Sequence, residues 1–170
     1  MNVSQLFSLL VAAMLTLSSA TSAQRRPPGS TVQETFAPVS IALKVGGATY
    51  NFNGPAVCEH LPRGSIYDIP AERWSVRHDE AGRNLSLTLW HPLSGRGDMI
   101  TISLSTGGRR HDVNTVTGRQ STATTGSGTI KFVPQRKGGT FDIEATASSG
   151  STISGIIKCE AFATPTPVAG

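Results

Sequence analysis

The stretch NLSLTLW, residues 84–90, decides the fold class of this chain. Its three leucines alternate with small polar residues, so the leucines share one face of an extended strand and the polar residues share the other. This pattern predicts a half-buried β-strand whose leucines lie in a core. Trp90 falls out of phase with the leucines, which leaves two alternatives: both faces of the strand are covered, or Trp90 makes a surface contact.

The same period-two alternation recurs along the chain between turns rich in glycine and proline. It is found at 41–45, 50–52, 74–76, 99–104, 129–133, 140–145 and 153–157. No stretch after residue 23 keeps an apolar period of 3.6 residues over ten or more positions. Short strands separated by such turns are typical of all-β domains. We therefore expect an antiparallel β-sandwich or small barrel of about eight strands.

The chain has two cysteines, Cys58 and Cys159, which lie 101 positions apart. In an exported chain such a pair is first interpreted as a disulfide. A metal pair and a nucleophilic thiol are the alternatives, but there is no C-x-x-C motif and only His60 lies close to either cysteine in sequence. We expect one disulfide, Cys58–Cys159, that ties an early strand to the last strand.

The chain begins with the features of a secretory signal peptide. An apolar run at 6–17 is followed by small residues at 18–23 and by a polar segment that starts at Gln24. A run of this length is too short to cross a bilayer comfortably, which takes about 20 apolar residues. We expect cleavage near Ala23 and a secreted or periplasmic protein, with an uncleaved membrane anchor as the alternative.

Composition divides the chain into four segments. We expect a signal peptide at 1–23, a flexible N-terminal arm at 24–38, a β-sandwich domain at 39–162 and a Pro/Thr tail at 163–170. No second apolar run of spanning length exists, so we expect no transmembrane segment in the mature chain.

Positive charge and one long patternless stretch mark the candidate binding residues. The formal net charge is +4, and 109–126 is the longest stretch without a clear pattern, which is typical of a functional or disordered loop. We take Arg109, Arg110, His111 and Trp90 as the candidate binding residues. The expected partner is an anionic surface or another protein. Nucleic acid is disfavoured because few aromatic residues are available for stacking on bases.

Carboxylates stand beside three of the four histidines, at Glu59-His60, His78-Asp79 and His111-Asp112. Adjacent residues on a strand face opposite sides, so these dipeptides need not share a site. The chain has no HExxH motif, no Cys/His cluster and no G-x-S-x-G elbow. We therefore predict no metal site, no cofactor and no catalytic residue.

Two ends of the chain carry a family resemblance. Gly47-x-x-Tyr50-x-Phe52-x-Gly54 leads into Cys58, and the strand 139–147 leads into Cys159. This order is similar to the mycobacterial lipoprotein antigen family, the LpqH type. The resemblance implies a β-sandwich at the cell surface with a Cys58–Cys159 bridge and no enzymatic role. The chain departs from the family at the predicted cleavage point, where the lipid-bearing cysteine is missing.

These observations favour an exported bacterial domain that binds a partner without enzymatic activity, either a ligand or a surface, with 109–126 as the expected contact. The alternative is a periplasmic or secreted carrier of a small apolar ligand, held in a barrel mouth or between sheets.

Overall fold

The computed structural model describes residues 34–117 and 124–165. The predicted signal peptide, most of the predicted arm, part of the 109–126 stretch and the end of the predicted tail lie outside these residues.

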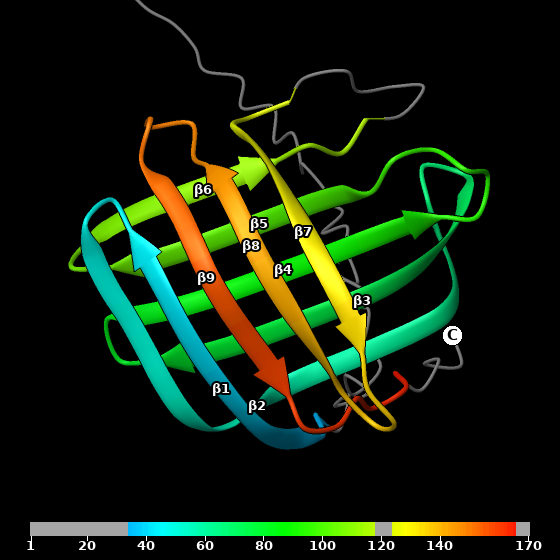
Figure 1. Ribbon diagram of the computed structural model, residues 1–170, viewed down its shortest axis with the longest axis horizontal. Helices are drawn as coiled ribbons and strands as arrows, with labels where there is room; N and C mark the ends of the chain where they lie inside the picture. The colour runs from blue at the N-terminus through cyan, green and yellow to red at the C-terminus, as the bar shows by residue number, and fades with distance from the viewer. Residues whose placement is uncertain (1–33, 118–123, 166–170) are drawn as a thin grey trace, which may run out of the picture. The chain divides into compact units, whose positions relative to one another are not determined.

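Within the described residues, nine antiparallel strands form a single sheet (Figure 1). The strands are β1 (Phe36–Val45), β2 (Ala48–Ile66), β3 (Ile69–Glu80), β4 (Arg83–Pro92), β5 (Met99–Thr106), β6 (Arg109–Asn114), β7 (Ser127–Pro134), β8 (Gly139–Thr146) and β9 (Thr152–Cys159). Their order across the sheet is β6-β5-β4-β3-β2-β1-β9-β8-β7. The predicted all-β class is confirmed. The described ranges contain no helix long and apolar enough to cross a bilayer.

β4 has the alternation that its sequence predicts. Leu85, Leu87 and Leu89 are buried, while Ser86 between them is exposed. The strand pairs with β3 on one side and β5 on the other, so its leucines lie in the middle of a continuous apolar face. Each buried leucine stabilises the fold by about 1.5–3 kcal/mol relative to an exposed one.

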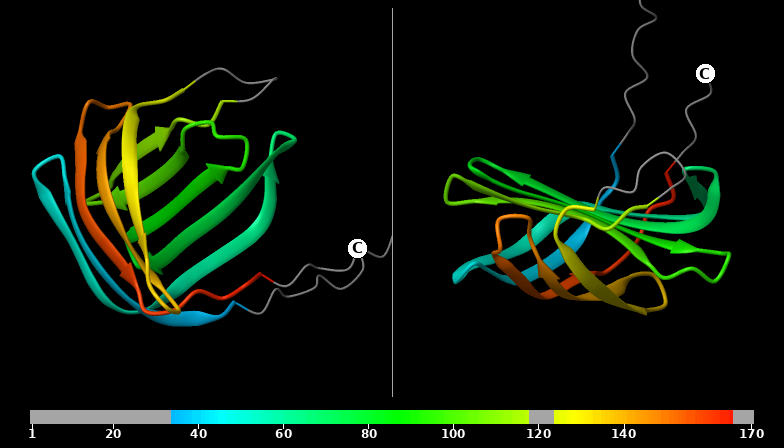
Figure 2. Two further views of the ribbon diagram at one scale, coloured as in Figure 1. Left: turned by 45° about the vertical axis from the view of Figure 1, so that its right-hand side comes forward. Right: turned by 90° about the horizontal axis from the view of Figure 1, so that it is seen from above.

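The sheet folds over on itself because β2 changes partner halfway along its length. Its residues up to Val57 pair with β1, and its residues from Val57 onward pair with β3. The result is two layers, one of β1, β9, β8 and β7 and one of β3 to β6, with the core between them (Figure 2). The two edge strands of the sheet, β6 and β7, approach each other. Asn114 at the end of β6 forms an antiparallel bridge with Thr125, which lies just before β7, so the sheet is a nearly closed, barrel-like structure.

The predicted disulfide is confirmed. Cys58 on β2 and Cys159 at the end of β9 are bonded and fully buried, with Cα atoms 6.4 Å apart. β1 lies between these strands in the sheet order, and strands two positions apart in a flat sheet are about 9.5 Å apart. The shorter Cα distance is possible because the sheet folds over at this point. The bridge therefore fastens the two layers at the bend.

The prediction of a patternless loop over 109–126 is wrong for its first part. Residues Arg109–Asn114 form β6, which pairs with β5 along its whole length. Only His111 and Val113 face the core from this strand. The sequence shows no apolar alternation in this strand, because only two of its residues face the core and one of them is the polar His111. Residues 118–123 lie outside the described residues.

The first strand begins inside the segment expected as an arm. β1 starts at Phe36, where it pairs with Val57, and Ala37 is already buried. β2 pairs with β1 as far as Phe36, so the first residues of β1 join the sheet through the backbone although they lack apolar periodicity.

Candidate functional site

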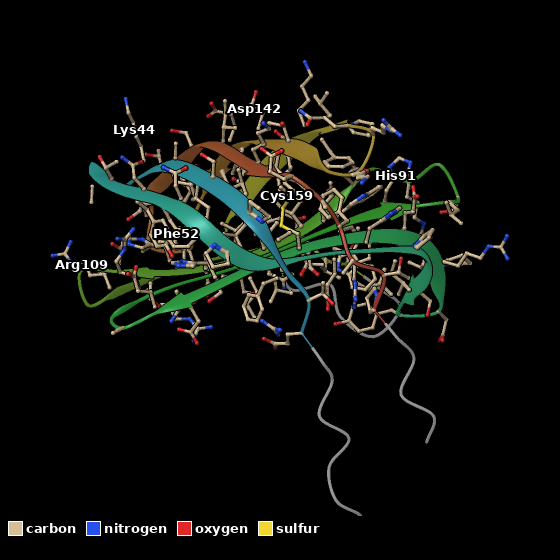
Figure 3. The ribbon with its side chains drawn as sticks, turned by 90° about the horizontal axis from the view of Figure 1, so that it is seen from below. Lys44, Phe52, His91, Arg109, Asp142 and Cys159 are labelled. Carbon is tan, nitrogen blue, oxygen red and sulfur yellow. A yellow bond between two sulfur atoms is a disulfide. The ribbon has the colours of Figure 1, made fainter. Side chains whose placement is uncertain are left out.

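A cavity of about 610 Å³ lies at one end of the two layers, and we call it the end cavity. Its lining comes from β2, β3 and β4 in one layer, and from β7 and the β7–β8 turn in the other. The segment that follows β9 contributes Phe162. Cavities of roughly 300–1,000 Å³ are usual for small-molecule sites. His91, one of the lining residues, marks this end of the sheet in Figure 3.

Four rings in contact form one side of the end cavity, and we call His60, Trp74, Phe132 and Phe162 the aromatic wall. His60 stacks on Trp74 with ring centroids 4.8 Å apart and planes 2° from parallel. The ring centroid of Trp74 lies 4.7 Å from that of Phe132, and the Phe132 centroid lies 6.0 Å from that of Phe162. The fully buried Phe141 packs 4.9 Å from Phe132. Such pairs contribute about 0.5–1.5 kcal/mol each beyond the area they bury.

Strand register explains why His60 faces the end cavity and its neighbour Glu59 does not. His60 is the cross-strand partner of Trp74, so the two rings stand on the same face. Glu59 points to the opposite face, where it accepts a hydrogen bond from Ser75 Oγ at 3.2 Å and lies 3.7 Å from Arg73. The expectation that adjacent histidine and carboxylate residues diverge is confirmed for this dipeptide.

Two histidine–carboxylate pairs line the end cavity. His60 Nε2 donates to Glu72 Oε1 at 3.1 Å, and His91 Nδ1 donates to Asp98 Oδ1 at 2.7 Å. The first pair is mostly buried, while the second is about half exposed. Both carboxylates of the lining therefore already have a hydrogen-bond donor. Within the described ranges, no three histidine, cysteine or acidic side chains come close enough together to hold a metal ion.

The β7–β8 turn, residues 135–138, brings positive charge to the end cavity, and we call it the basic turn. Gln135 N–H donates to the carbonyl of Gly138 at 2.9 Å, which closes the turn. Arg136 and Lys137 occupy its middle positions, are exposed and line the end cavity. Neither forms an ion pair with any described residue.

The basic turn is held down by close backbone contacts. A Cβ atom on Gly138 would lie 2.0 Å from the carbonyl oxygen of Cys159, so only glycine allows this approach. Phe162 N–H donates to the carbonyl of Lys137 at 2.8 Å, and Ala163 N–H donates to the carbonyl of Cys58 at 2.9 Å. The segment after β9 therefore ties the turn to β2 and places Phe162 in the aromatic wall.

The structure does not bring the predicted binding residues together. Arg109 lies at the opposite end of the sheet from His91, as Figure 3 shows. Arg110 Nε donates to both carboxylate oxygens of Asp112 at 2.9 Å. Burial would raise the pKa of Asp112, but hydrogen bonds from Arg110 and Ser103 outweigh it and lower that pKa.

Trp90 and His111 occupy two other environments. Trp90 lies on the outer face of β4, where it is partly exposed, with the Arg73 guanidinium 5.6 Å from its ring centroid. His111 is buried, and its Nδ1 has no hydrogen-bond partner among the described residues.

A second buried histidine lies away from the end cavity. Tyr50 Oη and His78 Nδ1 form a hydrogen bond of 2.7 Å, and the ring centroid of Phe52 lies 3.7 Å from that of the imidazole. Burial lowers the pKa of His78, which the nearby Glu80 carboxylate partly offsets. Burial raises the pKa of Tyr50, against the opposing effect of Arg83. This cluster is a neutral part of the core rather than an open site.

Sequence reasoning missed the end cavity, although it noted His60, one of the residues that line it. The two pairs and the aromatic wall join residues from distant strands, and no short motif contains them. One signal was present: Trp74 shares a strand face with Val76, and Phe132 shares one with Ile130, which placed both rings on core-facing sides.

Comparison with protein-family models, with curated proteins and with solved structures found no match to this chain. The resemblance to the mycobacterial lipoprotein antigen family stays a prediction from the two end motifs.

Proposed function

We propose that this protein is an exported, non-enzymatic binding protein that carries one small apolar ligand in the end cavity. The observation that carries this proposal is the aromatic wall. Phe132 and Phe162 are only partly buried although they pack against the core, so their rings offer apolar area to a ligand. The end cavity combines this apolar wall with polar and charged side chains, which can fix the orientation of a bound ligand.

The geometry favours this carrier over a binding site at 109–126. Arg110 already donates a hydrogen bond to Asp112. Trp90 lies far along the sheet from Arg109. The reason is the register, since Trp90 pairs with Met99 and Arg109 pairs with Thr106, at opposite ends of β5. Trp90 therefore shares no surface with Arg109, whereas the end cavity gathers its lining from both layers.

The disulfide supports the proposed location. Disulfides persist mainly in oxidising compartments such as the periplasm and the extracellular space. The buried Cys58–Cys159 bridge is consistent with the predicted signal peptide and with secretion or export to the periplasm of a bacterium.

Tryptophan fluorescence tests the proposal, because the chain has two tryptophans and one of them is in the aromatic wall. In a Trp90→Phe background, Trp74 alone reports on the end cavity. We expect saturable quenching of Trp74 on titration with 2-naphthylmethanol, a neutral probe with a flat apolar body. Phe132→Ala should weaken binding about tenfold or more, because truncation of a central aromatic contact typically costs 1–2 kcal/mol or more.

Phe36→Ala is the matched control, since Phe36 is 61% exposed and does not line the end cavity. Its binding should equal that of the parent protein. Absence of saturable quenching, together with native mass spectrometry that shows no co-purified small molecule, would overturn the proposal. Equal losses in Phe132→Ala and Phe36→Ala would also contradict it.

A further inference from the structure

Resting on the proposed function, we infer that the ligand of the end cavity is a small amphipathic anion. Its flat apolar body packs on the aromatic wall, and its anionic group binds the basic turn.

Charges of both signs line the end cavity. They are the carboxylates of Glu72 and Asp98 and the cations of Arg136 and Lys137, in addition to two histidines. Each carboxylate already accepts a hydrogen bond from an imidazole, at 3.1 and 2.7 Å. The two cations have no carboxylate within ion-pair distance among the described residues. Arg136 and Lys137 are therefore the charged groups of the lining that have no partner among the described residues.

Hydrogen bonding and close packing hold the backbone that carries the two cations. Lys137 is anchored through its backbone carbonyl, which accepts from Phe162 N–H, and the neighbouring Gly138 lies against the backbone of Cys159. The backbone of the basic turn is thus tied to the aromatic wall, because the carbonyl of Lys137 accepts a hydrogen bond from the N–H of Phe162, whose ring is part of that wall. Fixed geometry reduces the ordering cost of binding. The Arg136 guanidinium and the Lys137 ammonium, on neighbouring residues of one turn, both carry N–H donors for a carboxylate or similar anion.

The aromatic wall and the basic turn together match one kind of ligand. Stacked rings define the flat apolar side, and the cations lie on the turn that closes the other layer. A neutral apolar ligand would leave both cations unpaired, and a cationic ligand would meet carboxylates whose donors are already in place. An aromatic acid uses both parts at once.

Three probes of the same shape and different charge test the inference: 2-naphthoate, 2-naphthylmethanol and 2-naphthylmethylammonium. Trp74 fluorescence in the Trp90→Phe background reports binding of each probe. At low salt we expect 2-naphthoate to bind about three- to tenfold more tightly than the alcohol, because exposed ion pairs contribute about 0.2–1 kcal/mol each. This preference should shrink as salt is raised. The ammonium probe should bind most weakly.

Arg136→Gln/Lys137→Gln should remove the preference, so that the acid binds no more tightly than the alcohol. Arg109→Gln/Arg110→Gln is the matched control, since it removes the same charge at the other end of the sheet and should keep the preference. Equal binding of acid and alcohol would overturn this inference and leave the proposed function standing. Tightest binding of the ammonium, or a preference that survives Arg136→Gln/Lys137→Gln, would also overturn it. If neither the acid nor the alcohol binds, the proposed function itself fails.

Discussion

Removing the disulfide should produce a large and calculable loss of stability. In the double variant Cys58→Ala/Cys159→Ala, the unfolded chain regains the freedom of a loop with a sequence separation of 101 residues. In the chain-entropy model, closing a loop of this length stabilises the folded state by ~4.7 kcal/mol at 25 °C. Both sulfurs are fully buried, so the small cavities left by alanine add to this loss.

Urea unfolding measures the effect. If the free energy of unfolding falls by about 1.5–2 kcal/mol per M of urea, the loss lowers the urea concentration at the unfolding midpoint by about 2–3 M. The melting temperature should fall by roughly 10–20 °C. Because the unfolded chain becomes less compact without the bridge, the slope should also rise.

Chemical reduction provides the control. A thiol reductant should shift the midpoint of the parent protein toward that of the double variant and leave the double variant unchanged. A midpoint that moves by less than about 0.5 M in the double variant would refute the reasoning, because the bridge would then contribute under 1 kcal/mol.

Three further predictions concern the core, the turn and one histidine. Leu87→Ala should lower the free energy of unfolding by about 2–5 kcal/mol in urea, whereas Ser86→Ala on the exposed face should change it by under about 0.5 kcal/mol; equal effects would mean that β4 is not half-buried. Gly138→Ala should cost about 1–3 kcal/mol because its Cβ meets the Cys159 carbonyl, while Gly97→Ala, with open space around it, should be nearly neutral; a neutral Gly138→Ala would contradict the close approach. The lowered pKa of His78 means that the unfolded state binds more protons below about pH 6.5, so stability should fall as pH drops from 6.5 and level off above it. His78→Gln should flatten that part of the pH profile, and an unchanged slope in this variant would assign the effect to other groups.

The sequence predicted much of the fold because strand periodicity is a local signal. The alternation in 84–90 placed three leucines in the core, and the structure has them there. Glycine pairs marked hairpin turns, as at Gly46-Gly47, where both residues have positive φ. The prediction failed at β6, because a strand whose core face is made of His111 and Val113 has no apolar alternation to detect.

The candidate site was less predictable because its residues meet only through the fold. His60 is joined to Glu72 and Trp74 by the pairing of β2 with β3, and Phe132 arrives from a strand at the far edge of the sheet order. Arg136 and Lys137 are adjacent in the sequence, but their sequence neighbours do not show that they lie beside an aromatic cavity.

By itself, the sequence determined the all-β class, the main strands and the pairing of its only two cysteines. Each of these depends on neighbours along the chain or on the small number of possible partners. Only the tertiary structure decided that β2 bends at Val57, that the sheet folds into two layers, and that rings from β2, β3 and β7 meet at one end. The physical reason is that a cavity is a property of register and closure, which bring distant residues together, and no single strand contains that information.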